Sequence, residues 1–261
     1  MTSASVPLGT TNKLTRSFVC LLGVGAIVWG LFVLPLFWQE ASPRSVATKL
    51  LYDDDSFRLQ SLFDEAQQAE KSAQHSFCVP TALHSLFVLR LFILNRAFAE
   101  SNQSLVESSY DSPLDAARNA LNCTPADSFI WLTLFWLDAG KYGVNARNAN
   151  YLRLSYAWGP NEGWIALWRV RLALLLFERL PPDLSNRAVD DFINLVNTGA
   201  LYLQTAGIFK NASPAAQNRI VEQFGAVKLV KRQLFAATLR DEGVDADIPG
   251  VVKPARPWNS D

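Results

Sequence analysis

The stretch that decides the fold covers residues 124–168 and reads TPADSFIWLTLFWLDAGKYGVNARNANYLRLSYAWGPNEGWIALW. Its apolar residues recur at helical spacing and predict helices at about residues 126–138 and 145–157, separated by a glycine-containing turn at 140–143. The beginning of this stretch returns 35 residues later, so that Pro125, Asp127, Phe129, Ile130 and Leu132 correspond to Pro160, Glu162, Trp164, Ile165 and Leu167. The sequence therefore predicts a helix-turn-helix unit that is repeated.

A unit of this length is typical of tetratricopeptide (TPR) solenoids, in which stacked helix pairs bury a shared core. Trp131 and Leu134 fit the start of the consensus, and Pro160 fits its ending proline, but Phe135 stands where a small residue is usual. Further units are expected at residues 80–123, 183–197 and 214–240, because three or more are needed for a stable stack. The predicted fold class is all-α, with an N-terminal transmembrane helix followed by a TPR-like helical-repeat (α-solenoid) domain.

Short proline motifs predict where several of these helices begin. A capping residue, a proline at the first helical position and a carboxylate at the third satisfy the unpaired N–H groups and the dipole of a helix start. The motifs with all three parts are Ser112-Pro113-Leu114-Asp115, Thr124-Pro125-Ala126-Asp127 and Gly159-Pro160-Asn161-Glu162. Ser213-Pro214 has the cap and the proline without the acid.

The uncharged run at residues 17–38, SFVCLLGVGAIVWGLFVLPLFW, is long enough to cross a bilayer as a helix. A cleaved signal peptide is the alternative, but the apolar core of such peptides is only about 7 to 15 residues long, so we favour a retained anchor. Lys13 and Arg16 lie closer to the run than Arg44 and Lys49 do. This asymmetry favours a cytoplasmic N-terminus and an extracytoplasmic domain.

These patterns divide the chain into a cytoplasmic N-terminus (1–16), the transmembrane anchor (17–38), an amphipathic helical connector (39–76), the TPR-like domain (77–243) and an extended proline-containing tail (244–261). The tail, with Pro249, Pro254, Pro257 and Trp258, is expected either to cross the solenoid as a strap or to be disordered. The 24 basic and 24 acidic residues balance without a basic stripe, which argues against a nucleic-acid partner.

The cysteines bear on the compartment. Cys78 and Cys123 each stand two residues before a proline, and a disulfide between two such helix starts would suit an oxidising compartment. Two buried thiols are the other interpretation, and the residues do not choose between them. His75 and His84 flank Cys78 without metal-ligand spacing, so neither a metal site nor a cofactor is expected.

Residues 152–164 (LRLSYAWGPNEGW), together with residues 124–131 (TPADSFIW), resemble single-span TPR-like accessory proteins of bacterial exopolysaccharide and capsule synthesis. The resemblance covers roughly residues 110–180. It implies an inner-membrane protein with a periplasmic C-terminal domain, which helps polysaccharide assembly or export through protein partners in the membrane machinery. It brings no catalytic residues.

Aromatic residues crowd the same region: Phe129, Trp131, Phe135, Trp136, Tyr142, Tyr151, Tyr156, Trp158, Trp164 and Trp168. Core packing is the favoured interpretation, because large aromatic side chains are mostly kept for the area they bury. The alternative is a sugar-binding platform, with Trp158, Asn161, Glu162 and Trp164 as the candidate surface for a glycan or a protein partner. Of Arg169 and Arg171, one is expected to extend over apolar neighbours and the other to face water.

Three functions remain open from the sequence. The first is a non-catalytic, membrane-anchored adaptor, and the second is a carbohydrate-binding accessory protein. The third, a glycan-processing enzyme, would need a cleft with two converging carboxylates. The run Asp53-Asp54-Asp55 resembles a glycosyltransferase metal motif, but it precedes an amphipathic segment and fits a helix cap better.

Overall fold

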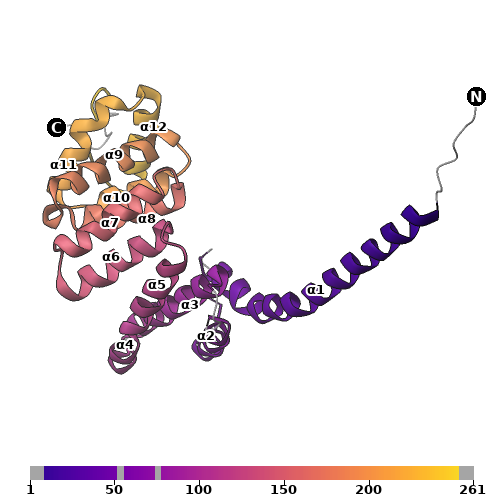
Figure 1. The fold of residues 1–261 in the computed structure, drawn as a ribbon. Coiled ribbons are helices and arrows are strands. Elements are labelled where there is room, and N and C mark those ends of the chain that lie inside the picture. Colours follow the sequence, from indigo (N-terminus) through magenta and orange to yellow (C-terminus); the bar gives the residue numbers. More distant parts are fainter. Residues whose placement is uncertain (1–8, 52–55, 74–77, 253–261) are drawn as a thin grey trace, which may run out of the picture. The chain divides into compact units, whose positions relative to one another are not determined.

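The structure is a computed structural model that describes residues 9–51, 56–73 and 78–252 (Figure 1). Within these ranges the chain forms α-helices and two 3-10 helices, with no strand, which confirms the predicted all-α class. The chain divides into two compact units, one ending at Thr124 and the other beginning at Pro125. Asp53, Asp54, Asp55 and His75 lie outside the described residues.

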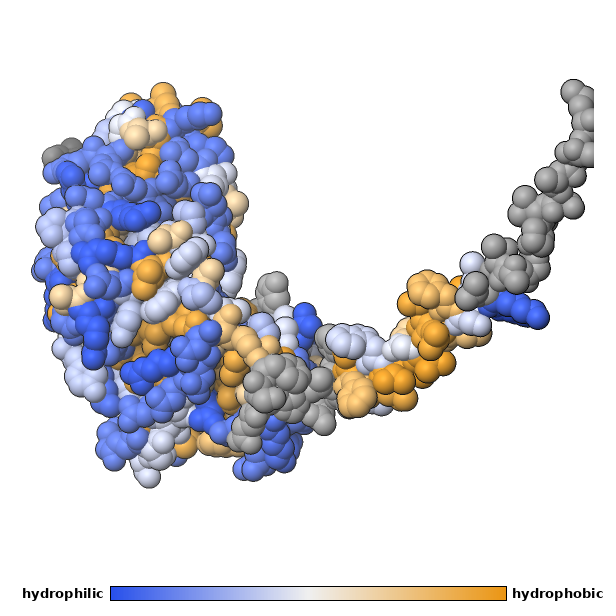
Figure 2. Space-filling view, viewed as in Figure 1, coloured by the Kyte–Doolittle hydropathy of each residue, from blue (hydrophilic) through white to orange (hydrophobic). Residues whose placement is uncertain are grey.

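The first unit begins with the long helix α1 (Gly9–Leu51). Its stretch Thr15–Leu34 has the length and apolar composition of a membrane span or a signal sequence, and none of it is buried in the molecule. Hydrophobic residues cover this part of α1 in Figure 2. The helix continues beyond the predicted anchor, and its last turns bury Ala47 and Leu50. The apolar run is thus the first part of a longer helix that ends in packed structure.

Helix α3 (Pro80–Ala99) is the core of the first unit. It packs against α1, α2 (Leu59–Ala73) and α5 (Asp111–Cys123), while the short α4 (Gln103–Ser109) joins α3 to α5. α3 is long and apolar enough to span a membrane, but 56% of its apolar window is buried. Its Arg90 also pairs with Glu70 of α2 at 2.8 Å. α3 is therefore the central helix of a bundle.

The compact units of the structure divide the chain at another place than the predicted boundary between connector and repeat domain. Residues 78–123, which were predicted to belong to the repeat domain, group with α1 and α2. The reason is the composition of α3: its buried residues lie on several sides of the helix, so it needs neighbours all round. Thr81 of α3 also donates a hydrogen bond to the buried carboxylate of Glu40, just beyond the apolar run.

The second unit consists of α6 (Ser128–Tyr142), α7 (Ala146–Trp158), α8 (Gly163–Leu175), η1 (Phe177–Arg179), α9 (Pro182–Thr198), α10 (Tyr202–Asn211), α11 (Pro214–Gln223), η2 (Phe224–Ala226) and α12 (Leu229–Asp241). α6 packs with α7, α8 with α9, and α10 with α12. α8 also contacts both α6 and α10. The predicted helix pair at residues 126–157 is therefore present, with ends shifted by one to four residues.

Four phenylalanine rings form the centre of the second unit's core, and in this cluster Phe235 of α12 contacts Phe192, Phe209 and Phe224 with ring centroids 5.5–6.3 Å apart. Together with their apolar neighbours these rings give the second unit a core of its own. The unit expected at residues 214–240 consists of two helices, α11 and α12, separated by η2, whereas the unit expected at residues 183–197 is the single helix α9.

The proline motifs predicted one helix start correctly and three incorrectly. Ser213 caps α11 by accepting from the N–H of Ala216, with Pro214 as the first helical residue. At the Thr124 motif the cap is Asp127 itself, which accepts from the N–H groups of Phe129 and Ile130, each at 3.1 Å. The carboxylate of Asp127 therefore caps α6, whereas the hydroxyl of Thr124 was expected to be the cap.

The other two incorrect starts shift in opposite directions. α8 begins only after Glu162, which stands at the cap position without a capping bond. α5 begins at Asp111, so that Pro113 lies in its first turn. A proline in the first turn loses no helical hydrogen bond, and this is why the motif does not fix the first residue.

The described part of the tail, residues 244–252, is a strap docked on the second unit. Gly243, at φ 75°, ends α12 in a Schellman motif, with the N–H of Val244 bonded to the carbonyl of Leu239. Ile248 is buried in the core, and Arg232 donates to the carbonyl of Pro249. Pro254, Pro257 and Trp258 lie outside the described residues.

Candidate functional site

The candidate site is the outward face of α8. Trp164, Trp168, Arg171 and Leu175 follow one another three or four residues apart and share this face. Trp164 is 48% exposed, Trp168 56% and Leu175 66%, and Arg171 is also exposed. The opposite face of α8 carries the buried residues Ile165, Ala166, Arg169, Val170, Ala173 and Leu174. α8 is therefore apolar on both sides, which is unusual for a surface helix and typical of a binding face.

The residues predicted for the site lie at the N-terminal end of this face. Trp158, the last residue of α7, is 51% exposed, and Asn161 and Glu162 are exposed in the turn that leads to α8. Trp164 contacts the ring of Phe129 on α6, with centroids 5.3 Å apart and a tilt of 45°. The structure thus exposes all four predicted residues, but it records no contact among their side chains.

Trp168, Arg171 and Leu175 were not among the site residues predicted from the sequence. They lie three or four residues apart in series from Trp164, on the side of α8 opposite the buried Ile165, Ala166 and Val170. The sequence does not show which of the two apolar faces of α8 is buried, because both faces have the same helical period. The packing of the neighbouring helices decides this.

The favoured interpretation of the aromatic cluster as core is only partly right. Phe135 and Tyr156 are fully buried, and Trp131 stacks on Tyr151 at 5.8 Å in a half-buried position. In contrast, four of the ten aromatic side chains are exposed: Tyr142, Trp158, Trp164 and Trp168. Core packing gives no reason for these four.

A buried arginine fixes α8 from behind. The side chain of Arg169 is fully buried, although the sequence predicted that one of Arg169 and Arg171 would extend over apolar neighbours and the other would face water. Its Nη1 donates to the carbonyl oxygens of Ser155 at 3.0 Å and Gly159 at 2.8 Å, which end α7. Its Nη2 lies 3.4 Å from Asp191 of α9. One side chain therefore ties α8 to both α7 and α9.

Burial changes the pKa values of two groups near Arg169, those of Tyr156 and Asp191. The ring of Tyr156 contacts two guanidinium groups, with Arg169 4.6 Å and Arg187 4.9 Å from its centroid. Burial raises the pKa of the Tyr156 hydroxyl, so the ring stays neutral. Burial also raises the pKa of Asp191, against the opposing effect of Arg169. This cluster is a structural support, since Arg169 and Tyr156 have almost no exposed surface.

Gly159 sets the turn between α7 and α8. A Cβ atom at this residue would overlap the side chain of Ser128, with only 2.6 Å to the Cβ of Ser128. The turn can therefore approach the start of α6 only because residue 159 has no side chain. Trp158 precedes this turn and Glu162 stands at its end, so the close approach helps to position both residues.

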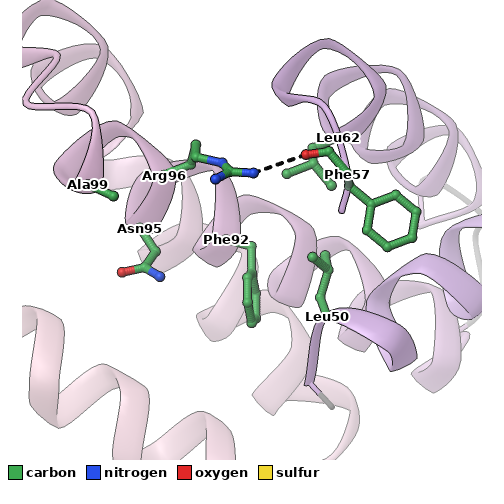
Figure 3. A pocket seen from close by; sticks show the side chains of 7 residues that line it. All are labelled: Leu50, Phe57, Leu62, Phe92, Asn95, Arg96 and Ala99. Atoms are coloured by element: carbon green, nitrogen blue, oxygen red, sulfur yellow. Dashed lines mark hydrogen bonds between the residues drawn. The ribbon is translucent and has the colours of Figure 1, made fainter. Parts of the chain in front are cut away.

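The first unit contains a small pocket (Figure 3). Leu50, Phe57 and Phe92 line it together with the guanidinium of Arg96, which donates to the Phe57 carbonyl at 3.1 Å. Its volume of ≈ 50 Å³ is far below the roughly 300 Å³ at which ligand sites begin. The described residues that line it include no carboxylate.

The candidate disulfide is present. Cys78 and Cys123 are bonded, with Cα atoms 5.9 Å apart, a usual separation for a disulfide. Cys78 precedes α3, but Cys123 is the last residue of α5, so the bond does not join two helix starts as predicted. Among the described residues, no group of three or more His, Cys, Asp and Glu side chains could hold a metal ion. His84 instead contacts Phe87 on α3.

Comparison of the chain with protein-family models, with curated proteins and with solved structures gives no match. The likeness to TPR-like proteins of polysaccharide synthesis therefore stays a prediction from the quoted motifs.

Proposed function

We propose that the protein is a membrane-anchored, non-catalytic adaptor of the TPR-like helical-repeat type, which binds protein partners in bacterial envelope polysaccharide assembly or export. The observation that carries the proposal is the outward face of α8, where Trp164, Trp168 and Leu175 are about half exposed or more and stand in one row. Tryptophan and arginine are the residues that most often dominate the energy of protein interfaces. Arg171 adds an exposed arginine to the two tryptophans on this face.

The support behind this face suits a preformed binding surface. Phe129 holds the ring of Trp164 from one side, and Arg169 fixes the helix that carries it. A surface that is already ordered loses less entropy when a partner binds. The pairing of α6 with α7 and of α8 with α9 is compatible with TPR-like stacking, in which such faces are the usual binding surface.

The proposed location is the inner membrane, with a periplasmic C-terminal part. Thr15–Leu34 would form a single span, and tethering would hold a weak binding surface at high effective concentration beside membrane partners. The Cys78–Cys123 disulfide supports an oxidising compartment.

The test is affinity capture of the full-length protein from solubilised membranes, with the double variant Trp164→Ala/Trp168→Ala in parallel. We expect polymerase, transporter or glycosyltransferase subunits to co-purify with the unchanged protein and to be lost with the double variant. Leu203→Ala is the matched control, since Leu203 is a 62% exposed apolar residue on α10. Recovery of the same chains with the double variant would reject this face as the docking site.

Exposure of the tryptophans also favours a second function, carbohydrate binding. Trp158, Trp164 and Trp168 are about half exposed, and exposed aromatic ring faces suit the apolar side of pyranose rings. Arg171 could donate hydrogen bonds to sugar hydroxyl or carboxylate groups.

Titration of the full-length protein in detergent with neutral and acidic bacterial polysaccharides separates the two functions. Carbohydrate binding predicts a saturable change in tryptophan fluorescence that Trp164→Ala/Trp168→Ala removes. If the spectrum is unchanged with every polysaccharide and protein partners are recovered, carbohydrate binding is rejected and the adaptor function is supported.

A further inference from the structure

The outward face of α12 is a second exposed apolar surface, separate from that of α8. Leu229 is 46% exposed, Val230 64% and Leu234 49%. At 3.6 residues per turn these three side chains fall within an arc of about 140°. The other side of α12 carries Phe235, Ala236 and Leu239, which are buried in the core. α12 therefore has two apolar faces: one packs in the core of the second unit, and the other is exposed.

The strap extends this face. A Cβ atom on Gly250 would lie 3.8 Å from the Cδ1 of Leu229, so the strap passes beside the first turn of α12. Val252, two residues further on, is 90% exposed. Leu229, Val230, Leu234 and Val252 together form the α12 patch.

Basic residues accompany the patch. Lys228, Lys231 and Arg232 lie in or next to the first turn of α12, and this turn carries no acidic residue. Cations at the N-terminal end of a helix oppose its dipole, so these positions weaken the helix. Lys231 reaches the carbonyl of Thr198 at 3.5 Å and Arg232 that of Pro249, while Lys228 is exposed at the cap position. Three positive charges thus collect beside exposed aliphatic side chains.

We infer that the α12 patch docks on the surface of an anionic lipid bilayer. Aliphatic side chains flanked by lysine and arginine are the combination that binds the boundary between headgroups and acyl chains of such membranes. The chain also carries its own candidate span, Thr15–Leu34, which would keep the patch close to a bilayer. The contact would hold the second unit against the membrane and orient it. It uses a different helix from the partner-binding face proposed on α8.

The test uses the full-length protein in nanodiscs, with an environment-sensitive fluorophore on a single cysteine. Cys20→Ser removes the free thiol and leaves the Cys78–Cys123 disulfide. Gln233→Cys places the label in the patch without removing an apolar residue, and Gln204→Cys on α10 is the matched exposed control. We expect the label at 233, but not at 204, to shift to the blue and to be quenched by brominated lipids. Both effects should be stronger with phosphatidylglycerol than with phosphatidylcholine alone.

Two variants separate lipid contact from folding. Val230→Asp puts an acid at the second helical position and Lys228→Asp puts one at the cap, and both changes favour the helix itself. Each should abolish the lipid quenching at position 233 without lowering the denaturation midpoint. Leu203→Asp, at the second position of α10, is the matched control and should leave the quenching unchanged.

Three results would overturn the inference. Equal quenching at positions 233 and 204, or none at either, would show that the patch does not meet lipid. A blue shift in lipid-free detergent that grows with protein concentration would identify a second copy as the occupant. A lipid-independent shift that disappears in a chain ending at Val252 would identify the chain's own C-terminal segment. Trp164→Ala/Trp168→Ala should not affect any of these signals, so failure here leaves the α8 proposal open.

Discussion

At the scale of single residues, Arg169 bears the most demanding role in the second unit. Its guanidinium is fully buried and bonds the two carbonyl groups at the end of α7, where the helix dipole is negative. The same group pairs with Asp191 of α9. A buried charge of this kind is costly to leave without its partners. The geometry of three helices thus depends on one side chain.

Replacing Arg169 with methionine should therefore cost about 3–5 kcal/mol of unfolding free energy, because Asp191 is left without its cation and two carbonyls lose their donor. Arg171→Met, two residues away on the exposed face, should change stability by no more than about 0.5 kcal/mol. Urea denaturation in mild detergent, followed by tryptophan fluorescence, measures both. Equal losses from the two variants would contradict the role given to Arg169.

The sequence predicts that Arg169 and Arg171 have different environments but cannot say which is which. They stand two residues apart on a helix that is apolar on both sides, so either could face the core. Position 169 becomes internal because α7 ends against it and brings the Gly159 carbonyl within 2.8 Å. The choice between core and surface for the tryptophans stays open in the sequence for the same reason: composition gives their apolar character, and only the packing of neighbouring helices decides their exposure.

At the scale of elements, helix ends show what local sequence leaves open. α3 ends in a Schellman motif whose left-handed position is Ser101, at φ 52°, with the N–H of Asn102 bonded to the Ala97 carbonyl. Glycine usually takes this position. Sequence rules that look for glycine find the end of α12 at Gly243 but not that of α3.

Ser101→Gly should stabilise the protein by about 0.5–1 kcal/mol, because the left-handed conformation strains a residue with a Cβ. Ser104→Gly, in the first turn of α4, should give no such gain and a small loss, since glycine has a low helix propensity and Ser104 is not in the left-handed conformation. Denaturation midpoints of the two variants compare them directly. A loss with Ser101→Gly would mean that the hydroxyl of Ser101 matters more than its backbone strain.

The contact between α7 and the start of α9 gives a pH-dependent prediction. Arg153 donates from Nε to Asp183 at 2.7 Å and from Nη2 at 2.9 Å, and this hydrogen bonding lowers the pKa of Asp183 below its usual 3.8. A lowered folded-state pKa stabilises the protein above the unfolded pKa, and this stabilisation is lost as the pH falls through the lowered value. The pair is largely exposed, so its contribution is below about 1 kcal/mol.

Asp183→Asn should accordingly be slightly less stable than the unchanged protein at neutral pH and equal to it in strong acid. The measurement is the difference in unfolding free energy between the two proteins, followed from neutral pH to about pH 2. A difference that stays constant over this range would show that Asp183 acts without its charge, for example as a polar residue in the first turn of α9.

At the scale of the whole molecule, the sequence predicts the all-helical class and the apolar N-terminal helix, because both depend on composition and period alone. The domain boundary predicted at residue 77 differs from the division into compact units, which falls between Thr124 and Pro125. The apolar α3 has the composition of a repeat helix, of a membrane span and of a bundle core. Only its contacts with α1, α2 and α5 decide among these roles.

The Cys78–Cys123 disulfide links this architecture to the compartment. It joins residues 45 positions apart and holds the end of α5 to the start of α3. Closing a loop of this length stabilises the protein by about 4 kcal/mol in the chain-entropy model. Such a bond persists only where the surroundings are oxidising. The redox state of these two cysteines in the cell therefore reports the side of the membrane on which the first unit lies.

We expect full-length protein from cells quenched in acid, when it is alkylated after denaturation, to carry label on Cys20 but not on Cys78 or Cys123, as read by mass spectrometry of unreduced peptides. Reduction, or the variant Cys78→Ser/Cys123→Ser, should lower the unfolding free energy by up to about 4 kcal/mol. Cys20→Ser is the control and should change neither the protection of Cys78 and Cys123 from alkylation nor the unfolding free energy, because Cys20 is not part of the disulfide. Alkylation of Cys78 and Cys123 in protein from such cells would instead place the bundle on the reducing side of the membrane, and the periplasmic location would have to be abandoned.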